Sequence, residues 1–340
     1  MTHSLSNLSY KLSGVDIKNG DLASKIAFGF AKKTFKNRKG LRGEPYPLEM
    51  GFSGLLNMGE FFLSFNSDGI GSKTKVAMDT GIHHTMGYDL VAMVADDCVC
   101  VGAEPVAMVN TLDMEKVEPP IVEKLMEGLE KAAGEAGVAV AGGEIAELRD
   151  QVHGYHWSAA MIGVVNPEKI IDGRKISEGD SLVALLTDNF RSNGFSLVRK
   201  VLEGSLGPWW HKNKYDDKIT WGEKILAPSK IFAPFILKLI GKNHESAKVE
   251  IHGISHITGG GLKHNMERIL PQGRSITVHN LPSVPEVMAK VKEMGQISKQ
   301  EAYQVWNMGI AVVLFTPEPK KVLEMAGQEG IHTQVIGVVE

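Results

Sequence analysis

Cysteine is nearly absent from this sequence, which has only Cys98 and Cys100 among its 340 residues. Two cysteines this close together supply neither a disulfide framework nor the four ligands of a structural zinc site. We interpret both as small side chains of a buried segment in a reducing compartment, which predicts a cytoplasmic location. The start of the chain is polar and has no apolar signal core, and no stretch approaches the roughly 18 apolar residues of a membrane span. We therefore expect no membrane partner.

An excess of positive charge is also missing. Lys and Arg number 37 against 40 Asp and Glu, which gives a net charge of −3. Dedicated DNA- and RNA-binding proteins show a strong basic excess, so the composition predicts no nucleic-acid partner. Glycine, in contrast, is abundant at 37 of 340 residues, or about 11 %, against a usual ~7 %. We expect the surplus in turns, or in loops where the backbone approaches a ligand closely.

Length and hydropathy pattern predict an α+β fold of two domains, because a typical domain holds about 150 residues. We place the first domain at residues 1–166 and the second at residues 167–340. In the first domain, strands are expected at 61–65, 106–112, 138–141 and 158–165, and helices at 88–101 and 119–136. In the second domain, strands are expected at 181–186, 249–253, 275–279, 310–315 and 333–338, and helices at 194–203, 228–240, 260–269, 285–294 and 317–326.

The first 59 residues show no regular hydropathy pattern. They contain a basic cluster: Lys32, Lys33, Lys36, Arg38, Lys39 and Arg42. A run of this kind is usually a solvated face of the protein. The alternative is an arm that binds phosphate groups.

The segment Asn66–Lys73 carries the strongest local signal of a ligand site, because it follows directly on an expected strand. Gly69 and Gly71 let backbone N–H groups approach phosphate oxygens, and Lys73 offers a cation. Asp68 suits Mg²⁺, a hard ion that prefers carboxylate oxygen. The spacing matches neither a Walker A loop nor a dinucleotide fingerprint. The alternative is a glycine-rich hairpin turn with an exposed lysine.

Two further carboxylate motifs fall in the same domain. Asp96 and Asp97 lie inside an apolar helix, where carboxylates are unfavourable unless they are paired or bound to metal. Gly142 and Gly143 precede Glu144 right after an expected strand, where α/β proteins commonly bind ligands. Together with the aspartate of the first motif, these carboxylates predict a magnesium–nucleotide site. The alternative is a set of exposed, helix-capping and turn residues.

Two motifs of the second domain precede expected helices. Ser192 and Asn193, in the run Arg191–Gly194, are candidate helix caps. The run Thr258–Gly261 ends in three glycines, which can hold an anion through free N–H groups and the helix dipole. His256, just before it, is either a structural histidine or a proton carrier. We find no convincing nucleophilic triad in the sequence.

At these motifs the sequence resembles the aminoimidazole ribonucleotide synthetase family, also called the phosphoribosylformylglycinamidine cyclo-ligases. The resemblance extends from about Tyr10 to Val338 and depends on several short blocks in a fixed order. These blocks are residues 10–11 with 14–17, 68–73, 87–93, 102–105, 142–147, 192–200, 256–261 and 307–309. Each block alone is weak evidence, but the complete series is specific.

The resemblance implies an α+β fold whose N-terminal domain joins its strands to those of a partner in a homodimer, with a second α+β domain beside it. It implies that the protein uses ATP and Mg²⁺ on a small-molecule ribonucleotide substrate. In this family, ATP phosphorylates the formyl amide oxygen of formylglycinamidine ribonucleotide. Attack by a neighbouring nitrogen then closes the imidazole ring, and phosphate leaves. The product, aminoimidazole ribonucleotide, belongs to de novo purine synthesis.

Carried over by position, the resemblance and the motifs give each site residue a role. The expected magnesium ligands are Asp68, Asp97 and Glu144. Expected ATP contacts are Asp16, Asp68, Gly69, Gly71, Lys73, Asp97, Gly142, Gly143 and Glu144. Expected substrate contacts are Ser192, Asn193, Thr258, Gly259, Gly260 and Gly261. The expected catalytic groups are Lys73 and Arg191 on phosphate charge, Asn193 on the substrate amide, and His256 as a proton carrier.

Three positions depart from the family pattern. Arg191 stands where the family usually has His, and Asp96 stands where it has Asn. Phe28 stands where a lysine is expected on the first helix, so that Lys25 or Lys32 would have to substitute. Arginine cannot act as a base near neutral pH, although it can stabilise phosphate charge. Two alternatives are therefore kept: another ATP-using enzyme of the superfamily, such as a small-molecule kinase or a phosphate-activating maturation enzyme, and a non-catalytic nucleotide-binding paralogue.

Overall fold

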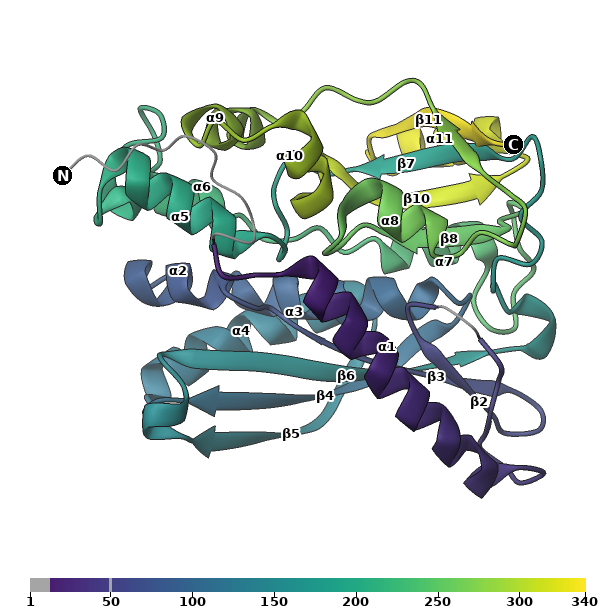
Figure 1. The fold of residues 1–340 in the computed structure, drawn as a ribbon. Helices are drawn as coiled ribbons and strands as arrows, with labels where there is room; N and C mark the ends of the chain where they lie inside the picture. The colour runs from purple at the N-terminus through teal and green to yellow at the C-terminus, as the bar shows by residue number, and fades with distance from the viewer. Residues whose placement is uncertain (1–12, 49–50) are drawn as a thin grey trace.

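The computed structural model of the chain describes residues 13–48 and 51–340, so the Tyr10–Lys11 block lies outside it. Each half of the chain builds one β-sheet with helices against it (Figure 1). The two sheets use separate stretches of chain, residues 44–165 and 181–339. The expected α+β class, with two units that each contain a sheet, is confirmed. Among the described residues, no helix is both long and apolar enough to cross a membrane.

The first sheet has six strands in the order β1-β2-β3-β6-β4-β5. Its bounds are β1 (Glu44–Pro45), β2 (Gly54–Asn57), β3 (Phe62–Gly69), β4 (Glu104–Met114), β5 (Ala139–Glu147) and β6 (Tyr155–Val165). All neighbours pair antiparallel except β4 and β5, which are parallel. Helices α2 (Lys73–Thr80), α3 (Met86–Val99) and α4 (Pro119–Ala136) lie on one face, and the other face is open in the part of the chain drawn as ribbon in Figure 1.

Helix α3 lies between the first sheet and the second unit and is apolar almost all round, as expected for a buried helix. Helix α4 packs on it at a very close crossing. A Cβ atom placed on Gly128 would lie 1.9 Å from the backbone oxygen of His84, and one on Gly87 would lie 2.2 Å from the backbone of Gly128. Only glycine fits such an approach, so these two positions fix where α3 and its carboxylates lie.

The second sheet has five antiparallel strands in the order β8-β10-β7-β11-β9. Its strands are β7 (Ser181–Leu186), β8 (Gly253–His256), β9 (Ile276–Val278), β10 (Ile310–Thr316) and β11 (Thr333–Val339). Its helices are α5 (Phe195–Leu206), α6 (Trp221–Ile225), α7 (Ala233–Ile240), α8 (Gly261–Glu267), α9 (Glu286–Met294), α10 (Lys299–Val305) and α11 (Pro319–Gln328). Every residue of β10 is buried, which is typical of a strand covered on both faces.

The N-terminal region differs from the expectation of an irregular segment. Asp16 caps helix α1 (Ile17–Thr34) by accepting a hydrogen bond from the N–H of Asn19 at 3.2 Å. The helix runs from the boundary between the two units across the front of the first unit (Figure 1), and its apolar side chains Leu22, Ile26 and Phe30 are 57 %, 54 % and 64 % exposed. Leu22, Ile26 and Phe30 are spaced four residues apart, so they form an apolar stripe along α1, but this stripe is exposed and covers no core.

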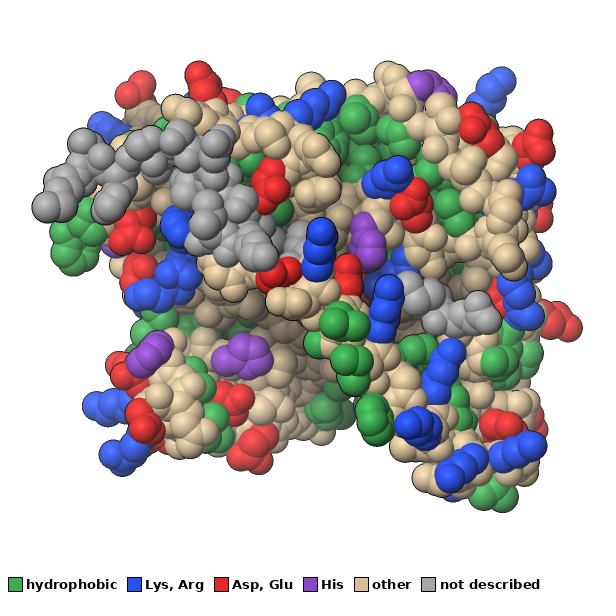
Figure 2. All heavy atoms as spheres, viewed as in Figure 1, with side chains coloured by type: hydrophobic (Ala, Val, Ile, Leu, Met, Phe, Trp, Pro, Cys, Tyr) green, Lys and Arg blue, Asp and Glu red, His purple; other side chains and the backbone are tan. Residues whose placement is uncertain are grey.

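The basic cluster is exposed on the end of α1 and on the turn that follows it, where Lys and Arg side chains gather at the lower right of Figure 2. The cation of Lys32 lies 4.8 Å from the ring centroid of Phe28, and that of Lys33 lies 4.3 Å from the ring of Phe30. This arrangement is consistent with the expected solvated face.

Most expected elements are confirmed, and α4 and β7 have the expected bounds. Three expectations are wrong in detail. Strands β3 and β5 continue through Gly69 and Glu147, so the motifs at 68–69 and 142–144 lie within strands, not after them. Glycine has a low strand propensity, but the ladders to β6 and β4 override it. Strand β8 begins at Gly253, later than expected, and the helices α2, α6 and α10 and the short strands β1 and β2 were not expected.

Candidate active site

One face of helix α3 carries three aspartates that meet the second unit. Asp89, Asp96 and Asp97 are spaced i, i+7 and i+8, which places them on the same side of a helix. All three are buried, with 0 %, 0 % and 9 % of their surface exposed. Each accepts hydrogen bonds from groups of residues 191–256, so the seam between the two units is built on these carboxylates.

Asp89 forms a buried ion pair with Lys73 of α2, with 2.6 Å between Nζ and Oδ2 and no exposed side-chain surface on either residue. The Lys73 ammonium also donates to the carbonyl of Ala227 at 3.0 Å, and Ser229 donates to Asp89 through its N–H and its hydroxyl. Burial lowers the pKa of Lys73 and raises that of Asp89, and the ion pair opposes both shifts. Lys73 is therefore not the exposed lysine of a hairpin turn, and its charge, which the sequence assigns to phosphate, is enclosed at the seam.

Asp96 forms a second buried ion pair, with Arg191. Their side chains are fully buried, and 2.5 Å separates Nη2 of Arg191 from Oδ2 of Asp96. The other carboxylate oxygen accepts the N–H groups of Phe232 and Ala233, at 2.9 Å and 2.8 Å, at the start of α7. Arg191 also donates to the carbonyl of Lys230 at 3.2 Å. The guanidinium is enclosed among protein groups, which does not fit the expected contact to a substrate phosphate.

His256 lies between Arg191 and Asp97. Nη1 of Arg191 lies 2.8 Å from Nε2 of His256, and Nδ1 of His256 lies 2.7 Å from Oδ1 of Asp97. An arginine can only donate, so Nε2 accepts and the ring proton is on Nδ1, from which it is donated to Asp97. Burial and then the nearby Arg191 charge lower the pKa of His256 to about 3. The expected role of proton carrier is not supported, because the imidazole stays neutral over the physiological range.

Asp68, near the end of β3, is a second carboxylate close enough to Asp97 to be affected by its charge. Burial, followed by the charge of Asp97, raises the pKa of Asp68 to about 6, and burial raises the pKa of Asp97 to about 7. Asp68 accepts the N–H of Gly69 at 2.7 Å. Two carboxylates whose charged forms are disfavoured in this way form a favourable donor set for a hard divalent cation, which neutralises both. Gly71 follows with φ +66°, a left-handed turn that leads into α2.

Glu144 lies apart from this carboxylate pair. In the sheet register it is opposite Thr111, which is opposite Ser158, which is opposite Gly69, so three strand spacings of ~4.8 Å separate it from the end of β3. Among residues 13–48 and 51–340, no cluster of three metal-ligating side chains is present. The expected three-carboxylate metal site is therefore not assembled within one chain.

The adjacent glycine pair has a packing role of its own. A Cβ atom on Gly143 would lie 2.7 Å from the backbone oxygen of Asn110 and 2.9 Å from its side-chain nitrogen. Asn110 in turn accepts the indole N–H of Trp157 at 2.9 Å. Gly143 thus leaves room for a buried asparagine between strands, whereas a Cβ on Gly142 would meet only a Val109 methyl, at 4.0 Å.

The second-unit motifs border the same seam. Ser192 is buried, and its hydroxyl has no hydrogen-bond partner among the described residues. Asn193 reaches across to helix α3, where its side-chain nitrogen lies 3.9 Å from Sδ of Met93. Buried polar groups are normally satisfied, so a hydroxyl left without a partner here fits a position that meets a ligand.

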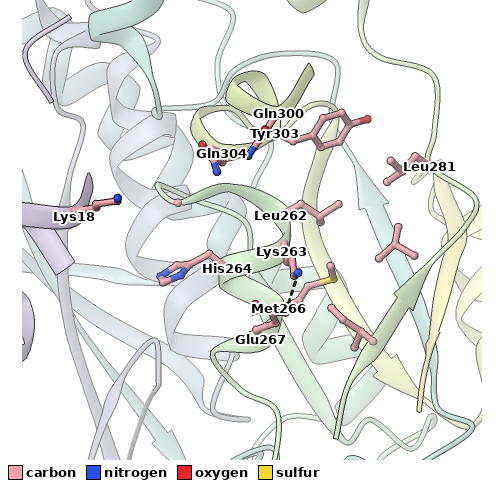
Figure 3. A pocket seen from close by; sticks show the side chains of 13 residues that line it. Lys18, Leu262, Lys263, His264, Met266, Glu267, Leu281, Gln300, Tyr303 and Gln304 are labelled. Carbon is pink, nitrogen blue, oxygen red and sulfur yellow. Dashed lines mark ion pairs between the residues drawn. The ribbon is translucent and has the colours of Figure 1, made fainter. Parts of the chain in front are cut away.

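The Thr258–Gly261 loop connects His256 to a cavity of about 850 Å³. Gly260 lines this cavity together with α8, α10 and β9, and Lys18 projects toward it from α1 (Figure 3). Asn265 holds the loop by donating to the carbonyls of Thr258, Gly259 and Gly261. A Cβ atom on Gly261 would lie 1.9 Å from the carbonyl oxygen of Tyr303, so close packing on α10 accounts for that glycine. The sequence reasoning missed Asn265, whose spacing from the loop was its only signal.

Arg268 was also missed. It is the C-cap of α8 and is partly exposed. Its charge lowers the pKa of Asp97, against the larger, opposite effect of burial. Its guanidinium lies over the Phe52 ring, 4.6 Å from the centroid, and donates to the carbonyl of Gly51. The site therefore contains a partly exposed cation beside the carboxylates, a role that the sequence assigned to Lys73 and Arg191. A single arginine after a helix gives no periodic signal from which this could have been found.

Comparison with family models places this arrangement in one class of proteins. Residues 53–165 match the family described as AIR synthase related protein, N-terminal domain, and residues 177–340 match AIR synthase related protein, C-terminal domain. Proteins named phosphoribosylformylglycinamidine cyclo-ligase from Pyrococcus furiosus and Thermococcus kodakarensis are 36 % and 35 % identical over 92 % of this chain, covering 89 % and 90 % of their own. One from Pseudothermotoga lettingae is 34 % identical over 97 % of this chain and 96 % of its own. The chain belongs to the phosphoribosylformylglycinamidine cyclo-ligase family.

The activity follows from this membership. The protein is an ATP-dependent ligase that closes the ring of formylglycinamidine ribonucleotide, giving aminoimidazole ribonucleotide, ADP and phosphate in purine biosynthesis. The resemblance seen in the sequence is thereby confirmed, and its small-molecule substrate with it.

Solved structures agree on the fold. A chain described as AaThiL complexed with AMPPCP and TMP has a TM-score of 0.64 at 16 % identity, with 92 % of this chain and 90 % of that chain covered. A HypE–HypF complex gives a TM-score of 0.62 at 18 % identity, with 85 % and 87 % covered. At these identities the likeness shows a shared architecture and nothing of the substrate.

Proposed function

We propose that Asp68 and Asp97 hold the Mg²⁺ that accompanies ATP, at the seam between the two units. The observation that carries this proposal is the half-buried Asp68 beside the buried Asp97, because two neighbouring carboxylates withdrawn from water are unfavourable without a cation. When bound, Mg²⁺ supplies neutralisation of the phosphate charge during phosphoryl transfer.

The remaining residues position the reactants around this point. We propose that Asn193 and the buried Ser192 hydroxyl contact the substrate amide, and that the Thr258–Gly261 loop lies along the ribonucleotide. Phosphoryl transfer makes the formyl amide oxygen a leaving group; the neighbouring nitrogen then attacks the same carbon, and phosphate departs. This chemistry depends on positioning and charge neutralisation, and it needs no protein nucleophile. In this scheme Asp16, the N-cap of α1, also contacts the nucleotide.

A metal-labelled complex tests the proposed site. Crystals of the full chain with a non-hydrolysable ATP analogue and Mn²⁺ should show an anomalous peak bonded to carboxylate oxygens of both Asp68 and Asp97, at about 2.0–2.6 Å. A peak that contacts neither residue, with the nucleotide bound, contradicts the assignment. Mn²⁺ is the appropriate probe because it shares the oxygen preference of Mg²⁺ and scatters anomalously.

We further propose that the open face of the first sheet joins that of a second copy in a homodimer. Phe65, Val109 and Ile162 project from this face and are 51 %, 46 % and 37 % exposed. The adjacent edge strand β5 is exposed along nearly its whole length. Contiguous apolar side chains of this kind on a sheet are typical of an interface. Glu144 lies on the same face, so we propose that it acts at this interface and not in the pair formed by Asp68 and Asp97.

Replacing Phe65 by Asp should convert the dimer to a monomer, because Phe65 and Ile162 are direct partners on the open face and a carboxylate there opposes burial. Light scattering after gel filtration should give the mass of two copies for the natural protein and of one for Phe65→Asp. The control is Leu323→Asp, since Leu323 on α11 is 37 % exposed but lies on the second unit. A monomeric natural protein, or equal effects of both changes, contradicts the proposal.

The cytoplasmic location expected from the cysteine content stays a prediction.

A further inference from the structure

We propose that Asp96 and Arg191 act together as one positioning unit, which fixes the imidazole of His256 and through it directs the carboxylate of Asp97 toward the bound metal nucleotide. This inference rests on the proposed metal site. It concerns two residues that touch neither metal nor substrate. It gives a reason for both departures from the family pattern on the α3 seam, because the two departing residues contact each other.

The first step is the rigidity of the pair. Both oxygens of Asp96 are engaged: one by Arg191, the other by two N–H groups at the start of α7. Arg191 is held further by the carbonyl of Lys230, and its own backbone N–H donates to the Asn189 side chain at 2.9 Å. Its φ of +55° lies in the left-handed region, which the surroundings must enforce in a non-glycine residue. The guanidinium therefore has a single available position.

The second step is the direction of the hydrogen bonds. A guanidinium has no acceptor, so Nε2 of His256 must accept from Arg191 and Nδ1 must donate. Among the residues that the structure describes, the hydrogen-bond partner of Nδ1 is Asp97 at 2.7 Å, and the imidazole is completely buried. A histidine at position 191 could donate or accept, whereas arginine removes that choice. The chain Asp96–Arg191–His256–Asp97 thus has one polarity, and Asp97 keeps its second oxygen for another ligand.

The third step is charge compensation. A lone arginine or a lone aspartate at either buried position would lack a partner, and an unpaired buried charge strongly destabilises a protein. With Arg191 and Asp96 both present, the pair has no net charge, and the Arg191 guanidinium donates a hydrogen bond to His256. Arg191 therefore does not indicate an inactive paralogue. Its charge is compensated within the protein by Asp96.

Five variants of the full-length protein test the unit: Asp96→Asn, Arg191→His, the double variant, His256→Asn and His256→Gln. The asparagine amide can replace the Nδ1 donor, whereas the glutamine amide reaches the Nε2 position. We expect either single change at the ion pair to weaken Mn²⁺ binding in the presence of an ATP analogue by about 10-fold or more, as for other groups that orient a metal ligand. The double variant should recover most of the melting temperature and of the Mn²⁺ affinity.

At His256, the Asn variant should bind Mn²⁺ within about 3-fold of the natural protein, and the Gln variant should lose about 10-fold. Calorimetry measures the affinity and thermal unfolding measures the fold, so a purely structural loss would lower both variants alike. Equal Mn²⁺ affinities of the two His256 variants, or a double variant no better than the worse single one, overturn the proposal.

Failure of the positioning unit can be distinguished experimentally from failure of the proposed metal site. If the natural protein binds Mn²⁺ with the nucleotide and Asp97→Asn does not weaken that binding, the proposed site fails. The ¹⁵N NMR signature of the His256 ring reports separately on the positioning unit, because it should show the proton on Nδ1 in the natural protein without metal or nucleotide. A proton on Nε2 would overturn the positioning role, whatever binds the metal.

Discussion

Replacing Asp68 or Asp97 by asparagine is expected to reduce turnover by about 100-fold or more at ordinary Mg²⁺ concentrations, while the folded protein stays as stable as before. The amide retains the size of the carboxylate but removes the charge that a hard cation requires. Losing one preorganised group that acts on transition-state charge commonly lowers turnover by about 10²–10³-fold. Steady-state assays across a Mg²⁺ titration measure the effect, and part of the loss should be recovered at high Mg²⁺.

The stability expectation separates this role from a structural one. Burial raises the pKa of Asp68 to about 6 and that of Asp97 to about 7, so both charges oppose folding when no cation is present. Removing one charge should leave the melting temperature of the ligand-free protein unchanged or raise it. Asp79→Asn is the matched control, because Asp79 is a partly exposed aspartate of α2 that pairs only with Lys75. Normal turnover of Asp68→Asn would show that the metal lies elsewhere.

Replacing Lys73 by methionine is expected to destabilise the ligand-free protein by about 3–5 kcal/mol, because it leaves the Asp89 carboxylate buried without its cation. The double variant Lys73→Met with Asp89→Leu should recover much of this loss, since it removes both charges from an apolar setting. Denaturant unfolding, followed without nucleotide, measures all three proteins. The comparison isolates the ion pair, because neither nucleotide nor substrate is present.

Lys75→Met provides the control on the same helix. Lys75 is 48 % exposed and pairs with Asp79 four residues on, so its loss should change stability by less than about 0.5 kcal/mol. If Lys73→Met instead kept its stability and raised the KM for ATP, Lys73 would be the phosphate contact that the sequence motif predicts. The structure favours the ion pair, because the ammonium is enclosed by Asp89 and the Ala227 carbonyl.

The elements of the fold could largely be predicted from the sequence wherever a segment has one buried face or is buried on all sides. Helix α4 has a continuous apolar stripe, two prolines at its start and Gly137 at its end, and its bounds match the expectation. Helix α1 buries no apolar face, since its apolar side chains are exposed, and only the resemblance, not the hydropathy pattern, placed a helix there. Glu144 was expected just after a strand because its glycines suggested a turn, whereas Gly143 makes room for Asn110 within the strand.

The candidate site was readable only in part. The carboxylates Asp68 and Asp97 were identified because acidic residues beside glycines or within an apolar helix are chemically unusual. Their partners could not be identified from the sequence, since Asp97 and His256 are separated by 159 positions and Asp89 and Ser229 by 140. Arg268 carries no motif of its own, and its role depends on where the end of α8 reaches the seam.

The sequence by itself determined the class of fold and the family, because those depend on local pattern and on ordered motifs, and it supplied candidates for binding a cation or a phosphate from side-chain chemistry alone. Only the tertiary structure decided which charges meet. It paired Lys73 with Asp89 at the seam and Arg191 with Asp96 across it. It also placed the ring proton of His256 on Nδ1, between Arg191 and Asp97. The physical reason is that a buried charge is defined by its neighbours in space, and in this protein those neighbours come from the other half of the chain.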